Sequence, residues 1–364
     1  MSAIKEYFKS KFKRVRLGYV HIPKETGPVN MTRILLNPKR ILIIPYNRMG
    51  TILLATRVFK SMREHYSSSK ITIAVHNSWS RLIQNDPTID ELVTFDDYIE
   101  NPNSKRFQSI GKKLTELDFD LAFFLSYQFE PGMAYLTRLS GADLRVSFKG
   151  NEDIDYFNVE VVPASGILYE VDRYLEMLRT LGIEGSVRDY TMTVSDSIRQ
   201  KARMRFLPAG PISKIGKLAG FDLTKEIVGD QISRKNAENT IKILVNDLKS
   251  TVVVFLEPDK KPLAASLKET FGKNIILVDD RPVSLLAGML SWCRFIVTHN
   301  TDLFQLAVAL KAPTLGILTK REMIQWSPGE SENIIHLERP NNSWPSSGKI
   351  VEAVKRLVKQ TKKK

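Results

Sequence analysis

The stretch that decides the fold reads KRILIIPYNRMGTILLATRVF and spans residues 39–59. Its apolar run at 41–44 predicts a short β-strand. A loop containing proline and glycine follows at 45–50, and Thr51 is a residue type that favours the N-cap of a helix. Apolar residues then recur at helical spacing. The segment therefore predicts strand, loop and helix, the repeating unit of a doubly wound α/β domain.

The same alternation continues through the first half of the chain. Further strand candidates are 71–75, 92–95 and 121–125, and helical periods fit between them at 105–117 and 131–140. The last of these strands is apolar throughout, as expected of a parallel strand that helices cover on both sides. The first half thus predicts one parallel sheet.

The second half repeats this organisation after an amphipathic helix at 168–183, which ends at a glycine. We therefore predict an α/β protein with two Rossmann-like, doubly wound domains facing a cleft, with a C-terminal amphipathic helix at 347–360. The expected strands of the second half are 218–223, 251–256, 274–278, 294–297 and 314–318, and the expected helices are 235–249, 262–271, 283–292 and 301–310.

Composition limits the class of protein. The chain has 364 residues and one cysteine, Cys293, which excludes an internal disulfide framework and a multi-cysteine zinc site. Its apolar runs are short, whereas a membrane-spanning helix needs roughly 20 residues, and no secretion signal is found. The simplest expectation is a cytoplasmic protein. The expected segments are a basic leader at 1–38, an N-terminal domain at 39–185, a linker at 186–212, a C-terminal domain at 213–345, and a C-terminal helix with a basic tail at 346–364.

The net charge of +14 is concentrated at the two ends of the chain. Residues 1–40 carry ten Lys/Arg and two Glu, a net +8, and residues 351–364 carry six Lys/Arg and one Glu, a net +5, which leaves +1 for the rest. A nucleic-acid-binding protein usually carries its charge as a patch on a folded face, so no nucleic-acid partner is expected. Three readings stay open for the ends: solvated tails, contact with an anionic membrane surface, and docking on a protein partner.

Two strand-to-helix loops form the candidate functional site, because parallel sheets bind ligands beyond the carboxyl ends of their strands. The second loop spans residues 298–302, where a helix start presents free N–H groups that suit a phosphate. Thr301 or Asn300 would serve there both as cap and as donor to the phosphate. A plain helix cap is the alternative for each loop. The first loop contributes Asn47, Arg48, Gly50 and Thr51.

Charged residues at other strand ends complete the candidate set. Arg234 and Lys235 precede a helix and offer positive charge to a diphosphate, with a solvated helix start as the alternative. Glu257 and Asp302 are the carboxylates that we place at strand ends near the expected cleft. The chain lacks a G-x-G-x-x-G after a strand, a Walker-type loop and an HExxH motif, and its five histidines lack metal-ligand spacing. No metal and no cofactor are therefore expected.

Several stretches in order resemble glycosyltransferase family 9, the lipopolysaccharide heptosyltransferases with the two-domain GT-B fold. The resemblance runs from about residue 39 to residue 358. It rests on the strand and glycine loop at 39–50, the strand 71–75 followed by Trp79, NDPTIDE at 85–91, FDLA at 119–122, GADLRVSF at 141–148, VDRYL at 171–175, LGI at 181–183, and the donor loop 297–318.

The resemblance implies transfer of a heptose from ADP-heptose to the inner core of lipopolysaccharide, without a metal, at the cytoplasmic face of the inner membrane. It also implies that the C-terminal half binds the nucleotide sugar and the N-terminal half binds the acceptor through Asn47, Arg48 and Gly50. The residues that we expect to bind the nucleotide sugar are Asn300, Thr301, Gln305, Arg234, Lys235 and Glu257.

Several positions depart from the family pattern. Thr51 stands where the family has an aspartate, and threonine cannot take a proton near neutral pH. In the donor loop Asn300, Asp302 and Gln305 replace an aspartate, a glycine and a histidine, and only Thr301 is retained. Thr51 and Asp302 are the catalytic candidates by position. Two functions stay open: an active glycosyltransferase, or a catalytically degenerate GT-B protein that acts as a binding or scaffold component of an envelope-associated assembly.

Overall fold

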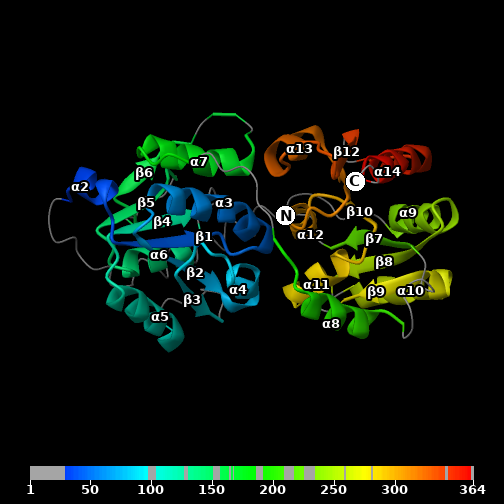
Figure 1. The fold of residues 1–364 in the computed structure, drawn as a ribbon, viewed down its shortest axis with the longest axis horizontal. Coiled ribbons are helices and arrows are strands. Elements are labelled where there is room, and N and C mark those ends of the chain that lie inside the picture. Colours follow the sequence, from blue (N-terminus) through cyan, green and yellow to red (C-terminus); the bar gives the residue numbers. More distant parts are fainter. Residues whose placement is uncertain are drawn as a thin grey trace, which may run out of the picture. The chain divides into compact units, whose positions relative to one another are not determined.

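The computed structural model divides into two compact units, which we call the first and second domains (Figure 1). The first comprises residues 1–166 and 171–188, and the second comprises residues 167–170 and 189–364. The structure describes residues 29–96, 104–126, 130–150, 156–163, 165–166, 168–185, 192–208, 217–224, 234–257, 260–279, 282–340 and 343–361.

The first domain is built on a six-stranded parallel sheet. Its strands are β1 (Arg40–Pro45), β2 (Lys70–His76), β3 (Glu91–Phe95), β4 (Leu121–Leu125), β5 (Leu144–Phe148) and β6 (Val159–Val161). Their order is β3-β2-β1-β4-β5-β6, and Ile41 of β1 pairs with Ile71 of β2 and Leu121 of β4. From Ile41 to Ile44 every residue of β1 is fully buried. The central strand is therefore covered on both faces, which is typical of an apolar strand in a parallel sheet.

Helices lie on both faces of this sheet (Figure 1). They are α2 (Met31–Leu36), α3 (Met49–His65), α4 (Asn77–Ile83), α5 (Lys105–Glu116), α6 (Pro131–Leu139) and α7 (Glu170–Thr180), which begins at the domain boundary. Phe107 of α5 stacks on Tyr135 of α6 with ring centroids 5.4 Å apart. Leu42 and Ile44 of β1 share this core. One face of β1 thus packs against α5 and α6.

The second domain repeats the topology of the first. Its strand order is β12-β11-β10-β7-β8-β9. Read from the β9 edge, the strands follow the same order as in the first sheet, with the first strand of the domain next to the fourth. All five pairings are parallel. The strands are β7 (Lys217–Leu223), β8 (Ser250–Leu256), β9 (Ile275–Val278), β10 (Phe295–Thr298), β11 (Thr314–Leu318) and β12 (Ile334–Glu338).

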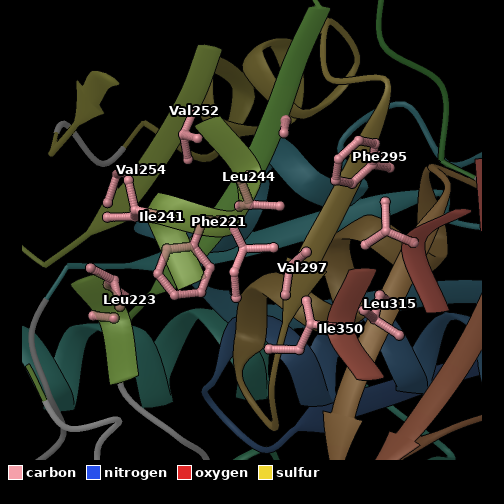
Figure 2. Packing of buried hydrophobic residues seen from close by; sticks show 14 of the residues in the cluster. Phe221, Leu223, Ile241, Leu244, Val252, Val254, Phe295, Val297, Leu315 and Ile350 are labelled. Atoms are coloured by element: carbon pink, nitrogen blue, oxygen red, sulfur yellow. The ribbon is translucent and has the colours of Figure 1, made fainter. Parts of the chain in front are cut away.

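The C-terminal helix closes the core of the second domain. The helices there are α8 (Asp196–Phe206), α9 (Arg234–Asn246), α10 (Lys261–Phe271), α11 (Val283–Leu290), α12 (Asp302–Ala309), α13 (Lys320–Trp326) and α14 (Ser347–Thr361), with a 3-10 turn η3 (Gly272–Asn274). Ile350 of α14 lies in one cluster with Phe221, Val297 and Leu315 of the sheet (Figure 2). The amphipathic pattern of α14 therefore buries its apolar face on its own domain.

Helix α8 lies inside the segment that the sequence predicts as a linker, 186–212. Ser195 caps it, and it packs against α11 at Gly288, where a Cβ atom would lie only 2.7 Å from the Cβ of Ala202. The missing side chain at position 288 permits this close approach. The predicted linker thus contains a helix that belongs to the second domain.

Helix α2 lies inside the predicted basic leader, 1–38, of which residues 1–28 fall outside the described residues. Asn30 caps α2 through its side-chain oxygen, and the Tyr66 hydroxyl donates to the carbonyl of Leu35 at 2.7 Å. The end of the leader is therefore bonded to the first domain at Tyr66, the C-cap of α3.

Cys293 is buried in the second domain, directly before β10. Its thiol donates to the carbonyl oxygen of Met289 over 3.4 Å. Burial raises the pKa of this thiol, because the thiolate would lose its hydration. The side chain behaves as a small apolar residue of the core.

Candidate functional site

Each sheet has one point where the strand order reverses, and the loops there form the candidate site. In the first domain the reversal lies between β1 and β4, and in the second it lies between β7 and β10. At such a switch point the chain leaves two adjacent strands toward opposite faces, so a crevice opens beyond their carboxyl ends. The two loops selected from the sequence, after β1 and after β10, lie at these two places.

Hydrogen bonds from a backbone N–H and from a hydroxyl group hold the loop after β1. Tyr46 donates its backbone N–H to Leu125 O at the end of β4, over 3.1 Å. The Thr51 hydroxyl lies 2.8 Å from Tyr46 O and 2.9 Å from Arg48 O. Because Arg48 is the N-cap of α3, the prediction that Thr51 caps this helix was wrong. Thr51 lies one turn inside and closes the loop from there.

The acceptor-side candidates surround this loop. Asn47 and Arg48 are partly exposed, whereas Gly50 is buried in the first turn of α3. The side-chain oxygen of Asn47 is buried and has no hydrogen-bond partner among the described residues. A buried acceptor that lacks a donor is costly, so this oxygen is suited to receive a hydroxyl group from a ligand.

The loop after β10 is more deeply buried. Thr298, Asn300 and Thr301 are each fully buried, and Thr301 is the N-cap of α12, accepting from the N–H of Phe304 at 3.2 Å. Of the two predicted caps, Thr301 and Asn300, the structure shows Thr301. Asp302 is the first helical residue and is partly exposed. A carboxylate at this position interacts favourably with the helix dipole.

A carboxylate that the sequence analysis did not select secures this loop. Asp222 of β7 is fully buried, and its Oδ2 accepts from the hydroxyls of Thr298, at 2.6 Å, and Thr301. Its Oδ1 accepts from the backbone N–H and the hydroxyl of Thr224, at 2.9 and 2.6 Å. An aspartate within an apolar strand, GFDL, was the available signal. It joins β7 to β10 across the switch point.

The buried ion pair of Glu322 and Arg339 holds Asn300 of the same loop. Asn300 donates from Nδ2 to Oε1 of Glu322 at 3.2 Å, and Arg339 approaches both carboxylate oxygens of Glu322 at 2.9 and 3.1 Å. Glu322 also completes a capping box with Thr319 at the start of α13. The side-chain oxygen of Asn300 has no hydrogen-bond partner among the described residues.

The remaining donor-side candidates divide into two groups. Gln305 lies with Thr301 and Asn300 at the start of α12, but it is buried and donates to the carbonyl of Trp326 at 2.7 Å. Arg234 instead lies at the start of α9, where it donates to Glu238 at 2.7 Å and to Ser266 of α10. The side chains of Arg234 and Lys235 are exposed, and Glu257, which follows β8, is partly exposed.

The described residues contain no group of three or more His, Cys, Asp and Glu side chains that could hold a metal ion. Within the same residues, no helix is both long enough and apolar enough to cross a membrane.

Comparison with known proteins identifies the fold. No protein-family model matches the sequence, and no curated protein matches it. Solved structures do match. The alignment with a glycosyltransferase of family 9 from Veillonella parvula (TM-score 0.74, 15% identity) covers 89% of this chain and 98% of that chain. The ADP-heptose lipopolysaccharide heptosyltransferase II of E. coli (TM-score 0.73, 16% identity) covers 89% and 99%. This chain has the GT-B fold.

A third structure extends the GT-B comparison. The E. coli heptosyltransferase WaaC with ADP matches with a TM-score of 0.61 and 15% identity, over 88% of this chain and 98% of that one. The same enzyme is also known with ADP-2-deoxy-2-fluoro heptose. The resemblance to glycosyltransferase family 9 that the sequence motifs predict is therefore confirmed at the level of the GT-B fold.

Proposed function

We propose that this protein is a glycosyltransferase that takes its sugar from a nucleotide sugar. The observation that carries the proposal is the fold, because both doubly wound domains align with nearly the full length of heptosyltransferase structures. By the same likeness the donor is ADP-heptose or a close relative, and the acceptor is a lipopolysaccharide or another cell-envelope glycolipid. The scaffold alternative has no structural observation of its own in its favour.

In this proposal each switch point binds one substrate. The second domain binds the nucleotide sugar beyond β7 and β10, with Arg234 and Lys235 offering positive charge to the diphosphate. The first domain binds the acceptor at the loop after β1. The unpartnered side-chain oxygens of Asn47 and Asn300 support this division, because each loop then holds one acceptor for a substrate hydroxyl.

The proposed reaction needs a base and a stabilised leaving group. An acceptor hydroxyl oxygen forms a bond to the anomeric carbon of the donor sugar, the bond from that carbon to the diphosphate oxygen breaks, and the hydroxyl proton passes to a carboxylate. Asp302 is the proposed base, because it is a partly exposed carboxylate in the candidate loops. Thr51 holds the acceptor loop, since its hydroxyl is already engaged with two carbonyl oxygens. We propose that no metal takes part.

Isothermal titration of the full chain with ADP and with ADP-heptose tests the proposal. We expect heat from both ligands, and transfer of the sugar to a lipopolysaccharide acceptor in a separate turnover assay. Binding without turnover would favour the degenerate, non-catalytic alternative. The absence of heat with either ligand at millimolar concentration would overturn the assignment.

Because the proposed acceptor is a glycolipid, we also propose that the protein binds peripherally to the inner face of the inner membrane. Residues 1–28 carry seven Lys/Arg and two Glu, and each basic residue near an anionic surface contributes ~1 kcal/mol. We therefore expect sedimentation with phosphatidylglycerol vesicles that weakens as salt rises and weakens further when residues 1–28 are removed. This truncation keeps α2, which is bonded to the first domain. Equal sedimentation of both proteins would remove the leader from the membrane role.

A further inference from the structure

Asp222 lies at the switch point of the second domain, where the proposed function places the diphosphate of the donor. Its neighbours Phe221 and Leu223 point into the core shared with Val297 (Figure 2). Because side chains alternate along a strand, Asp222 points to the opposite face of the sheet, as does Thr298 next to Val297. That face carries α12, whose cap Thr301 hydrogen-bonds to Asp222. The carboxylate thus lies one hydroxyl group away from the start of α12.

A second Asp-x-Thr turn in the molecule shows what is particular to Asp222. Asp86 accepts from the N–H and hydroxyl of Thr88 at 2.9 and 2.5 Å, as Asp222 does from Thr224 at 2.9 and 2.6 Å. The turn therefore needs only one carboxylate oxygen. At Asp222 the other oxygen reaches across to the hydroxyls that follow β10.

Within the described residues, the donors to Asp222 are uncharged groups. Across the described part of the chain, no lysine, arginine or histidine pairs with it, and its donors are three hydroxyls and one backbone N–H. A buried carboxylate without a cation is stabilised by such donors and by the positive end of a helix. The start of α12 supplies the second of these through Thr301, which also caps Phe304.

We propose that Asp222 is a specificity-determining residue that supplies an internal negative charge at the start of α12 and so lowers the affinity of this site for diphosphate groups. This inference rests on the proposed function, because it concerns how the same site selects its donor. A nucleotide sugar must then gain most of its affinity from the nucleoside and the sugar. The partly exposed carboxylate of Asp302 adds to the same repulsion.

Titration of ADP and of uncharged adenosine into the full chain and its variants tests this charge effect. Asp222→Asn removes the charge and keeps the shape, and Asp222→Ser is a second neutral variant with a hydroxyl that can still bond. The Thr298 and Thr301 hydroxyls lie 3.2 and 3.5 Å from His299 O, which provides each with another acceptor. Asp222→Glu retains the charge. Asp86→Asn is the matched control, since it neutralises the same turn in the first domain.

We expect both neutral variants to bind ADP about tenfold to a hundredfold more tightly than the unmodified chain, with adenosine affinity changed less than threefold. Asp222→Glu and Asp86→Asn should leave both affinities near their starting values. If ADP and adenosine bind but their affinity ratio is the same in all five proteins, Asp222 has no such role while the proposed function stands. If neither ligand binds any of the five proteins at millimolar concentration, the inference and the proposed function both fail.

Discussion

At the switch point of the first domain a hydroxyl group bonds to the loop after β1, whereas in the second domain two carboxylates bond to the loop after β10. Thr51 bonds to backbone carbonyls of its own loop, while Asp222 and Glu322 reach the second loop from other elements. The two sheets share one strand order, so topology does not impose this difference. The comparison teaches that loops at equivalent positions of one topology can be bonded within themselves or to elements distant in sequence.

Breaking the buried ion pair should show the largest effect. Arg339→Met leaves the Glu322 carboxylate buried without its cation, and we expect the second domain to lose about 3–5 kcal/mol of unfolding free energy. Chemical denaturation measures this. Arg356→Met, which breaks the exposed pair with Glu330, is the control and should cost at most about 1 kcal/mol.

A double variant, Glu322→Gln with Arg339→Met, sharpens this test, because the glutamine keeps a side-chain oxygen that accepts from Asn300 or from the Thr319 N–H. Removing both charges eliminates the unpaired carboxylate, so much of the lost stability should return. Equal losses for Arg339→Met and Arg356→Met would mean that the buried pair contributes no more than a surface pair.

Removing one hydroxyl from each loop compares the two switch points directly. Thr301→Val deprives Phe304 N–H of its cap and Asp222 of a donor, and should cost about 1.5–3 kcal/mol. Thr51→Val removes a hydroxyl whose one proton is shared between the carbonyl oxygens of Tyr46 and Arg48, and should cost about 0.5–1.5 kcal/mol. Thermal unfolding of both variants measures the difference. A larger loss for Thr51→Val would reverse our account of how the loops are held.

The smallest effect concerns His336 on β12, whose Nε2 lies 2.7 Å from Ser327 Oγ. Burial lowers the pKa of this imidazole below its ordinary 6.5, and the Glu330 carboxylate only partly opposes that shift. The unfolded chain then binds more protons than the native state as pH falls through 6.5, so stability decreases on acidification. Denaturation between pH 7.5 and pH 5 should show a shallower decrease for His336→Gln. Superimposable profiles for the two proteins would contradict this assignment.

Much of the fold was predictable because buried parallel strands consist mostly of apolar residues. All nine strands expected from such runs are present, for example β4 at Leu121–Leu125. The structure adds β5, β6 and β12, where polar residues such as Arg145, Glu160 and His336 interrupt the pattern. Hydrophobic periodicity does not reveal a strand whose polar residues find local partners, as Arg145 does in the carbonyls of Tyr156 and Ala142.

The site was less predictable, because its decisive contacts join residues far apart in sequence. The positions of Thr301 and Asn300 after β10 follow from strand order alone. Their partners Asp222 and Glu322 come from β7 and α13, and nothing in the sequence near residue 300 indicates them. Local spacing thus locates the loop but not the charges that surround it.

The buried thiol of Cys293 can report on opening of the second domain through its rate of alkylation. Alkylating reagents react with thiolates, and burial disfavours that form of Cys293 in the native state. Its labelling rate therefore measures how often local unfolding exposes the region before β10. Cys293 is the one cysteine of the sequence, so no other thiol contributes to the signal. Slower labelling in the presence of a nucleotide would reveal that ligand through protection alone, without a chromophore or a turnover assay.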